Sequence, residues 1–442
     1  MVFFKYLKYQ FKLHKKLIII VILTFLLNIY ITYSIFKLKS NNQLNLNYNL
    51  EGNDNILLPS LFLFDIDNLT DVKKRINSND SNLKNPFNYL IEEAENLLEV
   101  QSFSVTQKIL LPPSNDKHDY YSILPYSWKN ENGEYINKDG YVNPDILYYK
   151  DNYSLGTTAT RSFKLALVYF FTDDEKYASK SADLLRKWFL DEKTKMNPNF
   201  NWALSTPNGQ EGQGGSIEGM FLPLVIEADG LLTKSVSWTD VDHKNLVLWF
   251  NELLNWFLTS KIQLEDAESL NNHGTWNDIL IADFSLFVGK KDLAKKILNE
   301  ALIKRIEKQI EPEGKQTYEI SRSKSLWYSV FNLRALFHLA ELARHVNIDM
   351  FNYTSNDGRS LKKALDYLMP FIQGKKKWPY QQMSEEIWFV ESQQEVNELL
   401  LEILQAAAII YDDFSYADSL KFLGLKNQQY HISNLLYPSN KN

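Results

Sequence analysis

From about residue 85 onward, apolar residues recur along the chain at intervals of three and four positions. This spacing places them on one face of an α-helix and predicts a largely helical domain. The segments that follow the pattern are 163–171, 177–189, 244–258, 280–287, 293–306, 325–345, 361–372 and 395–411. The alternating pattern typical of strands is weak and scattered, so we expect an all-α fold.

Two of these stretches share one plan. In residues 168–189 and again in 285–306, an apolar helix end meets a short charged turn, and a second helix then starts with closely spaced alanine and lysine residues. Residues 336–372 form a looser third copy. Antiparallel helix pairs that stack side by side bury apolar surface that no single pair can cover. The repeat therefore predicts an (α/α) toroid of stacked antiparallel helix hairpins.

The N-terminal region has a different pattern. Residues 17–36 carry no charge, and a helix of this length spans roughly 30 Å, the thickness of the bilayer hydrocarbon core. Five lysines precede this run and only Lys37 and Lys39 follow it closely, which favours a cytoplasmic N-terminus. The alternative, a cleaved signal peptide, has a shorter apolar stretch and a small-residue cleavage site. We predict a single-pass type II membrane protein with its main domain extracellular or lumenal.

This topology divides the chain into four parts. We expect a cytoplasmic tail over residues 1–16, a transmembrane helix over 17–36, an Asn-rich stem over 37–85 and a folded domain over 86–442. Four N-glycosylation sequons on the exported side are consistent with this location and lie at Asn68, Asn79, Asn152 and Asn352.

Composition narrows the classes of function. The net charge is −6, so the chain as a whole has no basic footprint for nucleic acid. The absence of cysteine excludes disulfides, thiolate metal sites and cysteine nucleophiles. The 10 Trp, 25 Tyr and 26 Phe residues suit an enzyme that stacks sugar rings, although they also suit an ordinary core.

The most unusual segment for chemistry is 269–278, SLNNHGTWND. It lies between helical stretches expected to end near Lys261 and to start at Ile279, and it forms a helix poorly. His273 is one of only seven histidines and has amide side chains beside it at Asn271 and Asn272. A simple helix cap with an incidental histidine is the alternative interpretation.

A second segment, 318–332, contains Arg322 and Tyr328, six positions apart. These two side chains can meet if a helix begins between them. The alternative is an ordinary helix start, with the arginine on the surface and the tyrosine half buried.

Two loops have the composition of a binding cleft. Residues 197–219 are rich in Gly and Asn and include Gln213, but they lack the Lys-Ser/Thr ending of a phosphate-binding loop. Residues 125–145 form an aromatic, polar loop that contains Trp128, of the kind that lines sugar sites.

Metal and serine-hydrolase chemistry have little support. The sequence has no HExxH motif, and His338 and His345 lie seven apart on one predicted helix, which favours one surface and one half-buried side chain. A nucleophile elbow is also missing. We expect neither a metal nor a cofactor.

A glycoside hydrolase would need two carboxylates about 5–10 Å apart, for which the candidates are Asp278, Glu218 and Asp266.

Several segments resemble the alginate lyase superfamily of polysaccharide lyases. The signature stretches are NNHGTW at 271–276 and RSKSLWYSVFNLRAL at 322–336. Further similarity lies in 139–146, 165–201 and 357–372, so it covers roughly residues 120 to 380 in consistent order. Members of this family fold as an (α/α) toroid, in agreement with the hairpin repeats.

The resemblance implies cleavage of a uronic-acid polysaccharide by β-elimination without a metal. The C6 carboxylate must be neutralised, a base must take the C5 proton, and the leaving O4 must be protonated. By resemblance, Asn272 holds the carboxylate, while His273 neutralises it or takes the proton. Tyr328 protonates O4 and can also be the base. Arg322 assists Tyr328, because a phenol with a pKa near 10 needs a cationic neighbour to act as a base.

The resemblance also implies supporting or substrate-binding roles for Asn271 and Trp276, and more loosely for Gln213 and Trp128. The chain departs from the family pattern at Asn277, where many relatives have an aromatic residue, and at Trp327. Another uronate polymer is therefore as well supported as alginate. A catalytically silent glycan-binding domain displayed on a membrane is a further alternative.

Overall fold

The computed structural model describes residues 60–207, 209, 212–383 and 393–438. Contacts divide the chain into one unit over Met1–Leu57 and a second over Leu58–Asn442. The first unit, including the apolar run at 17–36, lies outside the described residues. Within the described ranges, no helix has both the length and the apolar character needed to cross a membrane.

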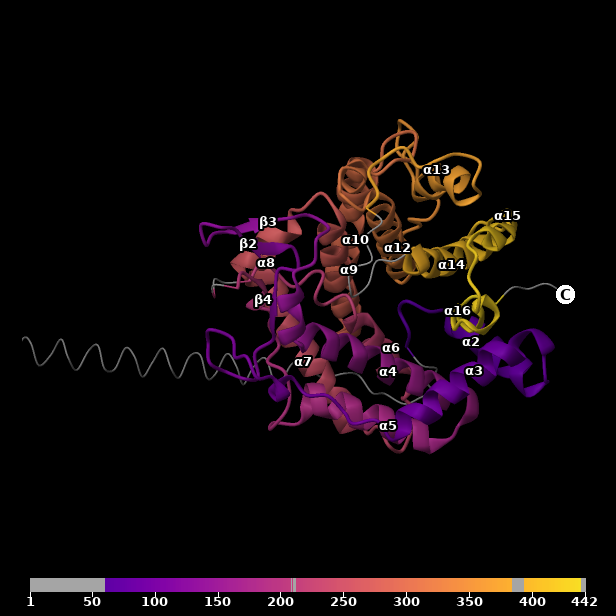
Figure 1. Ribbon diagram of the computed structural model, residues 1–442. Coiled ribbons are helices and arrows are strands. Elements are labelled where there is room, and N and C mark those ends of the chain that lie inside the picture. Colours follow the sequence, from indigo (N-terminus) through magenta and orange to yellow (C-terminus); the bar gives the residue numbers. More distant parts are fainter. Residues whose placement is uncertain (1–59, 208, 210–211, 384–392, 439–442) are drawn as a thin grey trace, which may run out of the picture. The chain divides into compact units, whose positions relative to one another are not determined.

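The second unit is built mainly of helices (Figure 1). Its α-helices are α2 (Ile66–Asn77), α3 (Ser81–Leu98), α4 (Asp151–Thr172), α5 (Glu175–Leu185), α6 (Leu222–Leu231), α7 (Asp240–Thr259), α8 (Lys261–Ala267), α9 (Asn272–Phe287), α10 (Lys291–Ala301), α11 (Thr317–Ile320), α12 (Ser325–Arg344), α13 (Leu361–Ile372), α14 (Gln393–Ile410), α15 (Ser415–Asp418) and α16 (Ser433–Leu436). Short π-helical turns extend α5 over Arg186–Leu190 and α10 over Leu302–Glu307.

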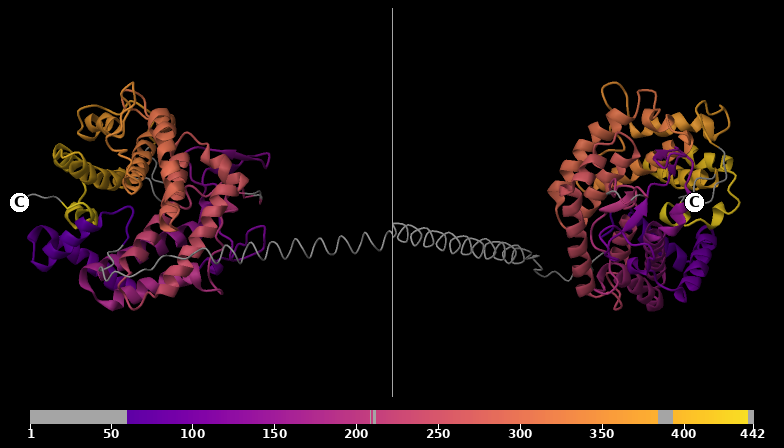
Figure 2. Two further views of the ribbon diagram at one scale, coloured as in Figure 1. Left: turned by 180° about the vertical axis from the view of Figure 1, so that it is seen from behind. Right: turned by 60° about the vertical axis from the view of Figure 1, so that its left-hand side comes forward.

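The helices of this unit contact one another in a closed order. The helix α4 packs against α5 and α6, and α9 packs against α7, α10 and α12. The order continues from α12 to α14 and α16, and α16 contacts α2 and α3. Because α3 in turn packs against α4, the C-terminal helices meet the N-terminal ones, as both views of Figure 2 show in yellow and indigo. The expectation of a helical domain with hairpin repeats is confirmed.

The charged turn of the first repeat is explained by backbone geometry. Between α4 and α5, Asp173 adopts a left-handed conformation with φ 57°, which a short Asp side chain tolerates better than most. The next residue, Asp174, caps α5 by accepting a hydrogen bond of 3.1 Å from the backbone N–H of Lys176. The turn therefore both ends one helix and starts the next.

The folded unit starts earlier than the sequence predicts. Residues 60–85 are not a stem, because Leu61, Leu63 and Phe64 are buried in the core and α2 and the first turn of α3 lie within this range. The buried carboxylate of Glu227 on α6 accepts the backbone N–H groups of Phe62 at 2.8 Å and Leu63 at 2.9 Å. This contact fixes the entry of the chain into the helical ring.

Glu227 should make stability depend on pH. Burial raises its pKa from 4.5 to about 7, against the opposing effect of the backbone donors. An acid whose folded-state pKa is raised loses stability as the pH rises from its unfolded pKa through the folded value, here by up to about 3 kcal/mol. Glu227→Gln should flatten this part of the pH dependence in urea unfolding between about pH 5 and about pH 8. The exposed control Glu252→Gln should not, and an equal effect of both would contradict the assignment.

Four short strands modify the all-α expectation. Strand β1 (Tyr121–Ile123) pairs in parallel with β4 (Trp202–Ser205), and β2 (Ser127–Lys129) pairs antiparallel with β3 (Tyr135–Asn137). Each has only three or four residues, too few to give a clear alternating pattern. The β1–β4 pair places the start of the loop 125–145 beside the loop 197–219, and the β2–β3 pair lies within the loop 125–145.

Candidate active site

The N-terminus of α9 carries the first group of candidate residues. The helix begins at Asn272 and not at Ile279 as the sequence suggested. Its cap is Asn271, whose side-chain oxygen accepts a hydrogen bond of 3.1 Å from the backbone N–H of His273. Asparagine is a favoured cap, so the residues that weaken a helix interior here start one.

The buried side chain of Arg305 stabilises the start of this helix. Its guanidinium is only 2% exposed and donates to Asp278 at 2.7 Å, to the carbonyl of Ser269 at 2.8 Å and to the carbonyl of Ala267 at 3.1 Å. A Cβ atom at position 274 would collide with this guanidinium and with the Ser269 carbonyl, which explains Gly274. The buried cation thus ties the end of α8 to the first turns of α9.

Asn272 is held by a buried carboxylate. Glu319 on α11 accepts the backbone N–H of Asn272 at 2.7 Å and its side-chain Nδ2 at 2.9 Å. Burial raises the pKa of Glu319 to about 7, while the Asn272 donors and the charges of Arg322 and His273 oppose the rise. This contact fixes the orientation of the Asn272 amide and leaves its second N–H and its oxygen for other partners.

Glu319→Gln should therefore lower kcat/KM on a uronate polysaccharide by about tenfold, the effect of losing one hydrogen bond to a charged group. The new side chain offers only one acceptor to the two Asn272 donors, so the Asn272 amide loses its fixed orientation. Glu311→Gln is a suitable control, because Glu311 lies just before the same helix and bonds only to Thr317 among the side-chain contacts seen. Wild-type kcat/KM in Glu319→Gln would contradict this role.

His273 has a buried carboxylate partner as well. Its Nδ1 lies 2.8 Å from Oδ1 of Asp266 on α8. The His273 side chain is 31% exposed, whereas that of Asp266 is 5% exposed. The imidazole therefore stands at the boundary between the protein interior and solvent, where a ligand can reach it.

Tyr328 and Arg322 form the second group. Because α12 begins at Ser325, between them, their six-residue spacing brings the side chains together as expected. The Arg322 guanidinium lies 3.8 Å from the centroid of the Tyr328 ring and donates a hydrogen bond of 2.7 Å to its hydroxyl. The Tyr328 hydroxyl also lies 2.9 Å from that of Tyr126.

Asp139 secures Arg322 from the opposite side. Its carboxylate accepts from Arg322 at 2.5 Å and from the backbone N–H of Ser323 at 2.9 Å. Burial opposes the guanidinium charge, but Asp139 and the phenols of Tyr328 and Tyr126 outweigh it and raise the pKa of Arg322. For Asp139, burial disfavours the charged carboxylate and by itself raises the pKa. The hydrogen bonds to Arg322 and Ser323 outweigh burial, so the pKa of Asp139 is lowered. Arg322 thus stays charged against Tyr328.

Glu319 connects the two groups. It contacts Asn272 directly, its carbonyl accepts the backbone N–H of Arg322 at 3.1 Å, and its carboxyl is influenced by the charges of both Arg322 and His273. The helices α9 and α12 also pack against each other. The fold therefore gathers all four candidate catalytic residues around one region.

The candidate substrate-binding residues have different outcomes. Trp276 is 1% exposed and packs against Phe331 and His338, so its burial in the core contradicts the expected contact with substrate. Gln213 is exposed, next to Gly214, which lies against the Asp266 side chain. Gln213 stays a prediction.

Trp128 stays a prediction too. It is partly exposed on β2, donates 2.7 Å to the carbonyl of Tyr141 and lies under the Lys138 ammonium group, 5.2 Å from the ring centroid. The loop that carries Trp128 also carries Tyr126 and Asp139, which contact Tyr328 and Arg322. Trp128 therefore lies on the loop that borders the second group of candidate residues. Asn271 has its side-chain oxygen engaged in the helix cap.

The three carboxylates suggested for a hydrolase already bind other side chains of the protein. Asp278 is paired with Arg305 in the protein interior. Glu218 is buried and accepts hydrogen bonds from Tyr120 and from Asn152 at 2.8 Å, and burial raises its pKa. Asp266 is bound to His273. Each of the three carboxylates is buried and already bound by another side chain.

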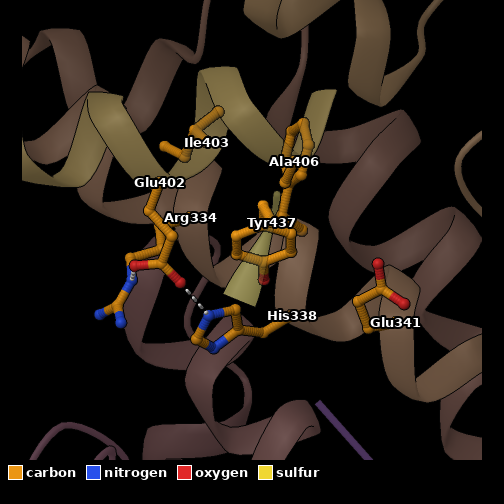
Figure 3. A pocket seen from close by; sticks show the side chains of 8 residues that line it. Arg334, His338, Glu341, Glu402, Ile403, Ala406 and Tyr437 are labelled. Carbon is orange, nitrogen blue, oxygen red and sulfur yellow. Dashed lines mark hydrogen bonds and ion pairs between the residues drawn. The ribbon is translucent and has the colours of Figure 1, made fainter. Parts of the chain in front are cut away.

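The histidines at 338 and 345 do not form a metal site. His338 is buried and lies 3.4 Å from Glu402, which also accepts 2.9 Å from Arg334, in the small pocket between α12 and α14 that Figure 3 shows. His345 is exposed and bonds to the carbonyl of Phe62. In the part of the chain that the structure describes, no group of three or more acidic or histidine side chains is arranged to hold a metal ion.

Four residues of the site were given no role from the sequence, namely Tyr126, Asp139, Arg305 and Glu319, and Asp266 was considered only as a carboxylate of a hydrolase. Asp139 stands in one of the stretches that resemble the family, and Glu319 precedes Arg322 by three positions, which are signals that could have been followed. Asp266 lies only seven positions before His273, whereas Arg305 lies 27 positions after Asp278 and Tyr126 lies 202 positions before Tyr328, and a single sequence gives no indication of these last two contacts.

The chain is similar to known proteins in both sequence and fold. The family model described as alginate lyase matches residues 104–378. An alginate lyase from Bacteroides ovatus has 33% sequence identity and a TM-score of 0.79, over 86% of this chain and 99% of that one. Alginate lyase A1-III from Sphingomonas species A1 shares the fold at 16% identity and a TM-score of 0.53, over 84% of this chain and 94% of that one. No curated protein sequence matches significantly.

The family match covers more than half of the chain, and the Bacteroides ovatus enzyme is similar over nearly its whole length. The residues 271–276 and 322–336 that first suggested the resemblance both lie in the region that the family model matches. The chain belongs to the alginate lyase family and is a polysaccharide lyase.

Proposed function

We propose that this lyase cleaves a uronic-acid-containing polysaccharide by β-elimination, with Tyr328 as the acid–base group. In this reaction the C5–H bond breaks and its proton goes to a base. The electron pair forms the C4=C5 double bond, and the C4–O4 bond breaks. O4 then leaves with a proton, so no water enters the products.

The contact between Arg322 and Tyr328 carries the proposal. A phenol acts as a base only when its deprotonated form is stabilised, and a cation is the strongest available stabiliser. The guanidinium touches both the ring and the hydroxyl of Tyr328, and Asp139 holds it there. The same hydroxyl, once protonated, can supply the proton that O4 requires.

The C6 carboxylate needs neutralisation before the C5 proton can leave. Asn272, His273 and Arg322 supply an amide, an imidazole and a guanidinium, and these groups suffice for the task without a metal. Asn272 and His273 also lie in the first turn of α9, where the helix dipole favours a negative charge. In the proposal His273 either neutralises the carboxylate or takes the C5 proton.

A panel of acidic polymers tests the proposal and identifies the substrate. The full-length chain would be incubated with alginate, polyglucuronate, hyaluronan and pectate in the presence of a metal chelator. Elimination gives an unsaturated uronate with near-ultraviolet absorbance, which we expect for one polymer. Alginate is the first candidate, since the Bacteroides ovatus relative is called an alginate lyase. New reducing ends without the absorbance would contradict elimination.

The location of the enzyme is part of the proposal. We propose that residues 17–36 anchor the chain and that the lyase domain lies on the exported side, as the lysine distribution favours. Two of the sequons, at Asn79 and Asn352, are exposed, whereas Asn152 donates its amide to the buried Glu218. Resistance to alkaline extraction and digestion of the domain by external protease would support this topology. Release of the intact chain by alkali would contradict it.

A further inference from the structure

The imidazole of His273 has one ring nitrogen committed to the protein. Its Nδ1 lies 2.8 Å from Oδ1 of Asp266, a carboxylate that the family resemblance did not single out. Asp266 is almost fully buried, with 5% of its side chain exposed, while 31% of the His273 side chain is exposed. The contact therefore lies on the protein side of the ring and leaves Nε2 for a ligand.

The Asp266 carboxylate has a well-defined place. Its Oδ2 accepts a hydrogen bond of 3.3 Å from the backbone N–H of Ser216, and Gly214 is so close that a Cβ atom there would collide with it. One turn earlier on α8, Gln263 accepts from the backbone N–H of Gly215 at 2.6 Å and donates to Asn277 at 2.9 Å. These hydrogen bonds join the loop 197–219, α8 and α9 around the Asp266 carboxylate.

A neutral histidine has two tautomers, and the partner of one nitrogen selects between them. A carboxylate accepts hydrogen bonds and cannot donate one, so its neighbour Nδ1 must carry the proton. The remaining nitrogen, Nε2, is then available to the substrate in a fixed direction. Without the carboxylate, the ring could rotate or take the other tautomer.

We propose that Asp266 is a positioning residue that holds His273 in the Nδ1–H form and directs Nε2 toward the uronate. The proposal rests on the lyase mechanism above, but its structural part can be tested without substrate. Asp266 does not touch the reacting atoms and acts only through His273. It stands in the same relation to His273 as Glu319 does to Asn272.

The test is Asp266→Asn in the full-length chain labelled with ¹⁵N at histidine. The backbone N–H of Ser216 retains the asparagine oxygen as its acceptor, so the amide NH2 faces Nδ1 and the ring should change to the Nε2–H tautomer, which ¹⁵N chemical shifts report directly. The His273 signals would be assigned with His273→Gln. We expect kcat/KM to fall by about 10²-fold, the loss typical of a displaced reacting group.

The chain offers a matched control in a second pair of a histidine and a buried aspartate. His243 Nδ1 lies 2.8 Å from Asp229, whose side chain is also 5% exposed. Asp229→Asn should change the His243 signals and leave both the His273 signals and kcat/KM as in the wild type. Comparison with this control separates the general effect of losing one buried carboxylate from the specific effect on His273.

The outcomes separate this proposal from the proposed function. Unchanged His273 signals or unchanged kcat/KM in Asp266→Asn would overturn the positioning role. If this variant does not fold, the wild-type spectrum decides, because a His273 ring without a proton on Nδ1 would also overturn it. A changed tautomer in a chain inactive on every uronate polymer would support the positioning of the ring and refute the proposed function alone.

Discussion

Replacing Tyr328 with phenylalanine should reduce turnover of the uronate substrate by about 10³-fold or more, within the range that general acid–base groups contribute. The change removes only the hydroxyl that Arg322 and Tyr126 contact. The ring and its stacking against the guanidinium remain, so substrate binding should change little. Initial rates of near-ultraviolet absorbance together with a binding measurement on the same polymer would show both effects.

Tyr177→Phe is the matched control for this variant. Tyr177 is 3% exposed and Tyr328 is 6% exposed, and the Tyr177 hydroxyl also has a polar partner, Glu95 at 2.5 Å. It lies on α5, which packs against α3 and α4 away from the site in Figure 1. Tyr177→Phe should keep full activity. A Tyr328→Phe variant that turns over substrate at the wild-type rate would contradict the acid–base role and favour a different proton carrier.

Replacing Arg305 with methionine should lower the free energy of unfolding by about 3–5 kcal/mol, the usual cost of breaking a buried ion pair. The substitution leaves Asp278 buried without its cation and frees the carbonyls of Ser269 and Ala267. Because these contacts fix the start of α9, activity should fall as well. Urea unfolding followed by tryptophan fluorescence measures the loss.

Two further variants test the reason for this effect. In Arg305→Met with Asp278→Leu, no charge stays uncompensated in the interior, so most of the lost stability should return. Arg186→Met breaks the pair with Asp242, in which the arginine is 35% exposed, and should cost much less. Equal losses in Arg305→Met and Arg186→Met would contradict the importance of burial.

Much of the fold could be predicted from local pattern. The three-and-four spacing and the charged turn before Tyr177 indicate a helix hairpin because both are local features, and α4 and α5 confirm it. The contact between Arg322 and Tyr328 could also be predicted, because the start of α12 between them is enough to bring the two side chains together. The prediction for α9 was less accurate, since Asn271 acts as a cap and so begins the helix earlier.

The parts that failed depend on contacts between distant segments. Residues 60–85 look polar enough for a stem, but Glu227, far along the chain, binds their backbone and draws them into the fold. Trp276 looks like a sugar-stacking ring, yet the same type of residue is just as suitable for the core, where it lies. Glu319 binds Asn272 from 47 positions further along the chain, and Asp266, although only seven positions before His273, binds it across the break between α8 and α9, so neither contact follows from helical spacing.

The central claim is elimination, and the masses of the products test it most directly. A defined oligouronide from the polymer that responds in the panel would be cleaved by the full-length chain and its two products weighed by mass spectrometry. Elimination adds nothing, so the product masses should sum to that of the substrate, with the double bond on the new non-reducing end. Products that together exceed the substrate by one water molecule would show hydrolysis and contradict the account.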